Sequence, residues 1–200
     1  MLRNTQSLIE TQNLRSYFSE ELTRASENQS IEIDEDVAAY LTRLLTDFSN
    51  PSSLFEKTED GVELKPLALY YLAAVEAENR ETQNLALRRL GDIALFIAGL
   101  FPASLNRKVM DVDYYIAMGG TAYSHLHDVL QWRVFADLAE RFVSFVDLLA
   151  EIAENSALNN HVDLMRDYEV WLRTGSPRLL NKLRRQGIVP AVSNVSRRQH

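Results

Sequence analysis

The chain of 200 residues contains no cysteine. It can therefore form no disulfide, thiolate nucleophile or cysteine-ligated zinc or iron–sulfur cluster. Glycine and proline are also scarce, with seven and five residues, and nearly all of them lie between segments of helical periodicity. This punctuation favours long helices over a fold with many tight turns.

Long apolar runs are absent as well. The longest, residues 93–101, is interrupted by Gly99 and stopped by Pro102. A helix of that length covers only about half of a bilayer. The N-terminal residues lack the apolar core of a secretory signal. We therefore expect no membrane span and a cytoplasmic location.

Charge is unevenly distributed along the chain. The net charge is −7 at pH 7, but all 28 acidic residues lie at or before Glu169, so the first 169 residues carry −14 and the last 31 carry +7. The basic end can contact a nucleic acid, an anionic surface or an acidic partner. It can equally dock on the acidic face of its own chain or of a sister subunit, which we favour because the acidic body repels a polyanion.

Apolar residues recur at helical spacing over most of the chain, and no segment alternates long enough to indicate a strand. The sequence predicts an all-α fold, an irregular bundle of seven or eight helices. The helices are expected at about residues 11–27, 34–49, 66–77, 83–100, 113–126, 130–154, 164–172 and 177–186, with an exposed loop at 56–63. Residues 83–100 are apolar on two sides, which is typical of a central helix. We expect one helical domain over residues 1–189 and a flexible basic tail over 190–200.

Asp92 lies in this central helix with apolar residues around it. A carboxylate in such a setting must be paired, hydrogen-bonded or protonated, because an isolated buried charge is too costly. Arg88 and Arg89 precede it by four and three residues and can lie beside it. The ordinary interpretation is a structural ion pair, and the alternative is an acid with a perturbed pKa in a pocket.

Small residues form two strips at helical spacing. Gly91, Ala94 and Ala98 form the first, and Ala117, Gly120 and Ser124, next to Gly119, form the second. Glycine inside a helix costs about 1 kcal/mol relative to alanine. We expect the strips to allow a close helix crossing; room for a ligand is the alternative.

The connection between the two strips mixes acids, bases and aromatic residues, as binding segments often do. With the neighbouring helices it supplies the candidate ligand-binding residues, which are Asp92, Arg107, Asp111, Asp113, Tyr114 and Tyr123. Asp111 and Asp113 have a second interpretation, as a turn residue and a helix N-cap. They are weak evidence for a metal, since two carboxylates alone do not define a metal site.

Known catalytic and cofactor motifs are missing. His125 and His127 are two residues apart and point to different sides of a helix, so they cannot share a metal there. No phosphate loop, dinucleotide fingerprint, nucleophile elbow or metal-binding helix motif appears. We expect no catalytic residue, no metal and no cofactor.

The segments LGDIALFIAGLFPASL and DVDYYIAMGGTAYSHL, within residues 90–126, resemble a block found in uncharacterised all-helical bacterial proteins. The resemblance implies no activity and no catalytic residue. It marks this region as the expected functional centre.

The sequence therefore predicts a non-enzymatic interaction or regulatory protein of the bacterial cytoplasm that forms a homo-oligomer or binds a protein partner. Aromatic residues in excess of what a small core needs motivate this prediction. The alternative is a small-molecule or enzymatic site between the helices at 83–100 and 113–126, around Asp92, Asp111 and Tyr114. A nucleic acid or anionic surface is a third possible partner, through the basic C-terminal helix.

Overall fold

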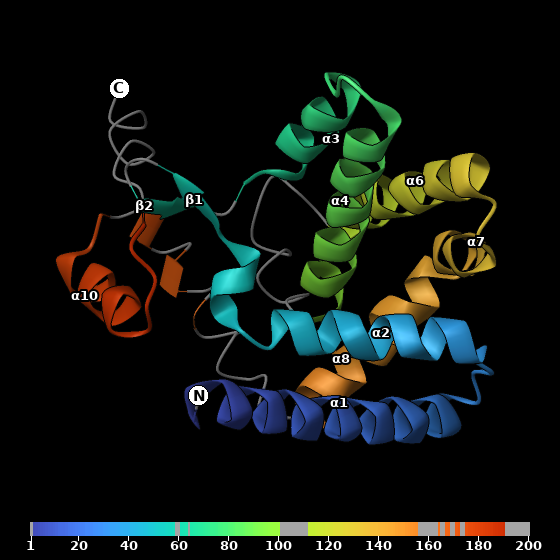
Figure 1. The fold of residues 1–200 in the computed structure, drawn as a ribbon, viewed down its shortest axis with the longest axis horizontal. Helices are drawn as coiled ribbons and strands as arrows, with labels where there is room; N and C mark the ends of the chain where they lie inside the picture. The colour runs from blue at the N-terminus through green and yellow to red at the C-terminus, as the bar shows by residue number, and fades with distance from the viewer. Residues whose placement is uncertain are drawn as a thin grey trace.

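The computed structural model describes residues 2–58, 61–63, 65–100, 112–155, 164, 167–168, 171–172 and 175–190. The fold is all-α, as predicted, with eight α-helices in the described residues and one short hairpin (Figure 1). In chain order the elements are α1 (Leu2–Gln29), α2 (Glu35–Phe48), the 3-10 helix η1 (Pro51–Leu54), β1 (Glu56–Thr58), β2 (Gly61–Glu63), α3 (Leu67–Val75), α4 (Arg80–Leu100), α6 (Val112–Leu130), α7 (Arg133–Glu140), α8 (Phe142–Asn155) and α10 (Pro177–Arg185). None of the helices in the described residues is both long and apolar enough to cross a membrane.

α2 illustrates how the sequence pattern sets the packing. It begins with Glu35 and Asp36, whose negative charges interact favourably with the positive end of the helix dipole. Its apolar side chains recur three and four residues apart and are all buried; they are Val37, Leu41, Leu44, Leu45 and Phe48. This face packs against α1, α4 and α7.

α4 is the central helix that the sequence predicts. Every residue from Ile93 to Leu100 is buried, because α6 and α8 pack on this half of the helix and the ring of Phe96 packs on that of Phe48 of α2 (Figure 1). The first half of α4 is more exposed, and the side chain of Leu85 is 62% exposed. One helix thus has a core half and a surface half.

Glycines allow α4 and α6 to cross closely. A Cβ atom on Gly91 would lie 2.6 Å from the ring of Tyr123, and a Cβ atom on Gly119 would lie 2.9 Å from the Cβ of Ala94 and would also overlap the ring of Phe142. The nearest atom to a Cβ on Gly120 lies 3.8 Å away. The close crossing is as expected.

The strip predicted for α6 is wrong in its register. Ala117 and Ser124 are exposed, whereas Gly119 and its neighbours Ala122 and Tyr123 are buried. The two sets of positions lie on adjacent sides of one helix, and small residues occur on both, so residue size alone did not distinguish them.

The long helix expected over residues 130–154 is two helices. Gln131 has a positive φ of 57°, which ends α6, and Arg141 has φ −110° and ψ 24°, which separates α7 from α8. α7 packs on α6 and α2, whereas α8 packs on α4 and α1. Leu138 and Phe142 are buried on either side of the break, so the apolar spacing continues through it and hides it.

Smaller differences concern the ends of elements. Residues 56–63, expected as a loop, include the antiparallel pair β1–β2, in which Lys57 faces Val62. α1 begins at Leu2 rather than near residue 11. Pro66 precedes α3 instead of opening it, and α6 begins at Val112, so Asp113 lies in its first turn and is not an N-cap. Apart from the hairpin and the start of α1, these differences lie within the few residues to which local sequence patterns define the ends of elements.

The basic helix α10 docks on the chain itself. The hydroxyl of Ser176 accepts a hydrogen bond from the amide of Leu179, and Gly187 adopts φ +81° after the last turn; both residue types are common at such helix ends. Leu183 is fully buried, and Nζ of Lys182 lies 2.6 Å from Oδ2 of Asp167. This supports the docking interpretation of the basic end; of the tail expected over 190–200, the structure describes only Pro190, which is buried.

The neighbouring glycines Gly119 and Gly120 provide a matched test of the α4–α6 crossing. Gly119→Ala should lower the free energy of unfolding by about 1–3 kcal/mol, because the new methyl group overlaps Phe142 and Ala94. Gly120→Ala should raise it by up to about 1 kcal/mol, because alanine favours the helix and the space is open. Urea denaturation measures both, and equal destabilisation would contradict this packing.

Candidate functional site

The structure brings together two of the six residues predicted as a ligand site. Asp92 on α4 and Tyr123 on α6 are hydrogen-bonded to each other. Asp113 and Tyr114 lie in the first turns of α6, and nine residues separate Tyr114 from Tyr123, about 13 Å along a helix. The remaining two, Arg107 and Asp111, lie outside the described residues.

Asp92 is held by side chains from two other helices. The hydroxyl of Tyr123 donates a hydrogen bond of 2.8 Å to Oδ1 of Asp92, and the hydroxyl of Tyr40 on α2 donates one of 2.5 Å to the same oxygen. Nε of Arg88 lies 3.8 Å from Oδ2 of Asp92 and donates a 3.3 Å hydrogen bond to the hydroxyl of Tyr40. Asp92 is therefore hydrogen-bonded and paired, as a carboxylate with only 18% of its side chain exposed must be.

The electrostatics of this Tyr40–Asp92–Tyr123 network follow from burial. Burial raises the pKa of Asp92 above its ordinary value, against the opposing effect of the two tyrosine hydrogen bonds and of Arg88. Burial, and then the negative charge of Asp92, also raises the pKa of Tyr40 and of Tyr123. Although burial opposes the charge of Arg88, the neighbouring Tyr40 and Asp92 raise its pKa. At neutral pH both tyrosines and Arg88 keep their protons.

Tyr40 is the residue of the network that the sequence analysis missed. It lies on α2, 52 positions before Asp92, and its ring is partly buried beside the apolar stripe of that helix. In the sequence pattern of α2, Tyr40 looks like any aromatic residue at the edge of a buried helix face. No signal in a single sequence connects it with a carboxylate on another helix.

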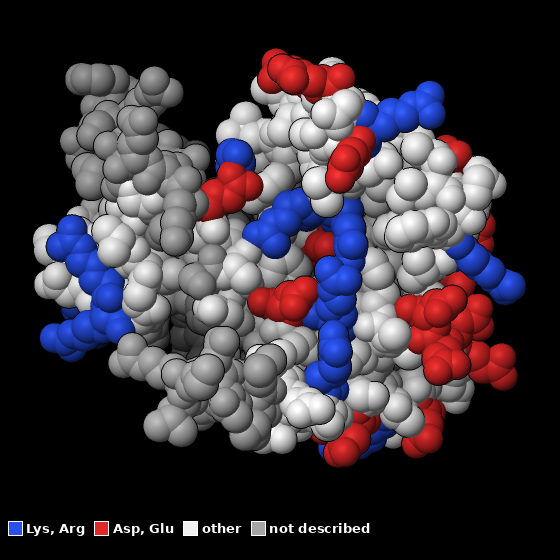
Figure 2. Space-filling model, viewed as in Figure 1, with Lys and Arg blue, Asp and Glu red and all other residues white. Residues whose placement is uncertain are grey.

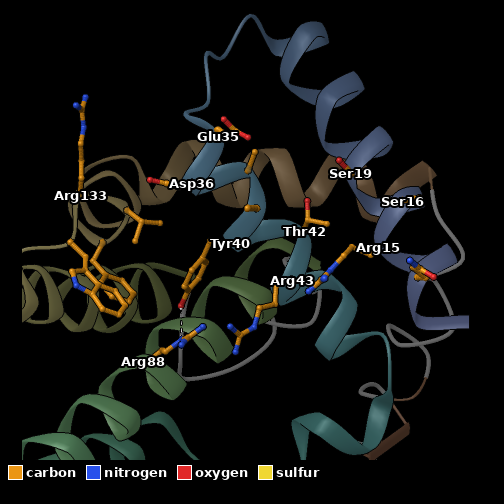
Figure 3. Close-up of a pocket in the computed structure, with 16 residues that line it drawn as sticks. Arg15, Ser16, Ser19, Glu35, Asp36, Tyr40, Thr42, Arg43, Arg88 and Arg133 are labelled. Atoms are coloured by element: carbon orange, nitrogen blue, oxygen red, sulfur yellow. Dashed lines mark hydrogen bonds between the residues drawn. The ribbon is translucent and has the colours of Figure 1, made fainter. Parts of the chain in front are cut away.

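A groove of about 1170 Å³ opens next to this network (Figure 3). Tyr40 and Arg88 line the groove, and Asp92 lies behind them, outside its lining. The other walls come from α1, α2 and the start of α7, and the polar side chains among them are Gln12, Arg15, Ser16, Ser19, Glu35, Asp36, Thr42, Arg43 and Arg133. This volume is somewhat larger than the roughly 300–1,000 Å³ of typical small-molecule pockets.

Arginines from three helices gather at one end of the groove. Figure 3 shows the side chains of Arg15, Arg43 and Arg88 in a row, with Arg43 between the other two. Figure 2 shows the same face with a line of basic side chains running over α4, α2 and α1. Within the described part of the chain Arg15 forms no ion pair, and Arg43 forms only an exposed 3.5 Å contact with Asp47. This end therefore carries positive charge that the described residues neutralise only in part.

The other end of the groove is aromatic and carries both signs of charge. Trp132 is 56% exposed and stacks on Phe135 with an interplanar angle of 7°. Glu35 and Asp36 line the groove here, and Nη2 of Arg133 lies 3.7 Å from Oδ2 of Asp34. The groove thus has an apolar surface at one end and a cationic surface at the other, and the two surfaces come from different helices.

Metal-binding groups do not assemble in the residues that the structure describes, where no three His, Cys, Asp or Glu side chains are close enough to hold an ion. His127 instead places Nδ1 3.2 Å from the backbone carbonyl of Trp132.

No family model, no curated protein and no solved structure matches this chain. The resemblance in residues 90–126 therefore stays a prediction, and what the site does is argued from its own geometry.

The two predicted tyrosines provide a matched test of the network. Tyr123→Phe should lower the free energy of unfolding by about 1–3 kcal/mol, because Asp92 loses a hydrogen bond in a largely buried position. Tyr114→Phe should change it by less than about 0.5 kcal/mol, since Tyr114 is only partly buried and lies against Tyr115. Urea unfolding of both variants makes the comparison, and equal losses would contradict the network.

The raised pKa of Asp92 predicts a pH dependence of stability. A carboxyl whose pKa is higher in the folded state loses stability as pH rises from its ordinary value, 3.8, through the raised folded value, because unfolding then releases a proton. Asp92→Asn lacks this effect. The free energy of unfolding of the variant minus that of the wild type should therefore increase with pH across this interval and then level off. Denaturation curves from pH 3.5 to 8 test it, and a difference that falls as pH rises would contradict the shift.

Proposed function

We propose that this protein is a non-enzymatic binding protein whose groove takes a small anionic ligand bearing phosphate or carboxylate groups. The observation that carries the proposal is the row of Arg15, Arg43 and Arg88 on one groove of a chain with net charge −7. Three like charges side by side repel one another, and an anion between them removes that repulsion.

Two of the three arginines are held by other side chains of the protein. Arg88 is oriented by Tyr40 and Asp92, and both of these interactions use Nε, so the planar group is already in place for a ligand. The pair of Arg43 with Asp47 is exposed on both sides, at 55% and 63% of the side chains, and an exposed pair contributes only about 0–1 kcal/mol. A bound anion can therefore replace Asp47 at small cost. Guanidinium groups match phosphate and carboxylate oxygens with two parallel hydrogen bonds.

The protonation states of Tyr40 and Arg88, the two residues of the network that line the groove, support binding rather than acid–base catalysis. A general acid or base works best with a pKa near the operating pH. The pKa values of Tyr40 and Arg88 both lie above their already high ordinary values, so neither exchanges protons at neutral pH. They offer hydrogen bonds and charge, which are the contributions of a binding site. Trp132 at the opposite end offers an apolar face for the uncharged part of the ligand.

The test uses pyrophosphate and citrate as probes, by isothermal titration calorimetry at low salt. The Arg15→Gln/Arg43→Gln variant should bind at least tenfold more weakly than the wild type, since the loss of about 1.4 kcal/mol corresponds to that factor. The matched control is Arg184→Gln/Arg185→Gln, which removes the same charge from the exposed side of α10 and should bind like the wild type.

Pyrophosphate binding without citrate binding indicates a phosphate ligand, and the reverse indicates a carboxylate. The proposal is refuted if the wild type binds neither probe. It is also refuted if the control variant weakens binding as much as the groove variant does, because the effect would then come from net charge alone.

A further inference from the structure

α3 exposes apolar side chains over most of its circumference. Only a narrow stripe of Leu67, Tyr70 and Ala74 is buried, against α4. Large apolar side chains of α3 and the neighbouring turn of α4 remain between 42% and 62% exposed; they are Leu69, Tyr71, Leu72, Val75 and Leu85. Several large exposed apolar side chains on one short helix mark an interaction site.

The outward side of α3 is well defined by helix geometry. At 100° per residue, Leu72 points away from the buried stripe, with Leu69 and Val75 on either side of it. Figure 1 shows α3 at the edge of the molecule, beside the first half of α4. Another chain can thus approach it without displacing an element of the bundle.

We propose that a second copy of this chain covers this face, with two α3 helices packed antiparallel across a two-fold axis. The apolar surface is of the right size. Five side chains with these exposures present roughly 500 Å². A standard interface buries about 800 Å² per partner, of which about 65% is apolar in homodimers.

The charges around α3 match an antiparallel arrangement. α3 contains no charged residue; Lys65, which forms an ion pair with Glu56 of its own chain, precedes it, and Glu76 and Glu78 follow it. In an antiparallel pair each acidic end lies beside the partner's Lys65 and beside the positive end of the partner's helix dipole. A parallel pair would place the acidic ends together. A two-fold axis uses the same surface on both chains, so no second complementary surface is needed.

Disulfide crosslinking tests the face directly, because the chain has no cysteine of its own. Leu72→Cys should form a disulfide-linked dimer under mild oxidation. In the proposed pair the two Leu72 residues lie next to the two-fold axis, where their Cα atoms can come within the roughly 4.4–6.8 Å that a disulfide needs. Val143→Cys is the matched control: it lies on α8, is 53% exposed, and should stay monomeric on a non-reducing gel.

Light scattering over a dilution series gives the second measurement. The wild type should have twice the chain mass of 22.9 kDa. Leu72→Glu should reduce it to the mass of one chain, because a charge would be buried at the axis, whereas Val143→Glu should leave the dimer intact. Circular dichroism confirms that each variant is folded. A wild type that is monomeric at every concentration overturns the proposal, as does a dimer that Leu72→Glu leaves unchanged. Neither measurement depends on anion binding in the groove.

Discussion

A single carboxylate, Asp92, constrains the centre of this protein. It lies on α4 immediately before eight consecutive buried residues, where a bare charge would be very unfavourable. The hydroxyls of Tyr40 and Tyr123 and the guanidinium of Arg88 satisfy it. Because these groups come from α2, α6 and α4, their hydrogen bonds require three helices to meet at one point. Close contact of the α4 and α6 backbones there requires Gly91, whose missing side chain leaves room for the ring of Tyr123.

The network also sets the chemistry of the surface above it. Tyr40 and Arg88 each have one side toward Asp92 and another in the lining of the groove. Arg88 additionally lies over the ring of Tyr40, with Cζ 5.1 Å from the ring centroid, so its plane is restrained as well as its charge. A buried acid thus fixes the position of an arginine at the surface. The ordinary and the functional interpretations of Asp92 meet here: the acid is structurally paired, and the pairing shapes the proposed binding groove.

Local pattern was sufficient for much of the fold. Helical spacing predicted α2 and α4, and the apolar surroundings of Asp92 predicted that it must be paired. Arg88 was predicted from its position one turn away. Tyr40 was not, because its contact with Asp92 spans 52 residues and depends on how α2 crosses α4. The break at Arg141 was missed for a similar reason: one continuous apolar spacing serves two helices that pack on different neighbours. The groove is lined by residues of four separate segments, so the sequence pattern of no single segment predicts it.

The distribution of burial along α4 explains where both proposed surfaces lie. Its second half is buried on all sides, and substitution there is limited by packing density. Its first half packs on α3 and, through Arg88, contacts Tyr40 of α2, while other side chains there face solvent. Leu85 is exposed there, and Arg88, one turn later, reaches the groove. A central helix can be buried in the core over only part of its length. The remaining part provides surface that a small helical protein can use for recognition.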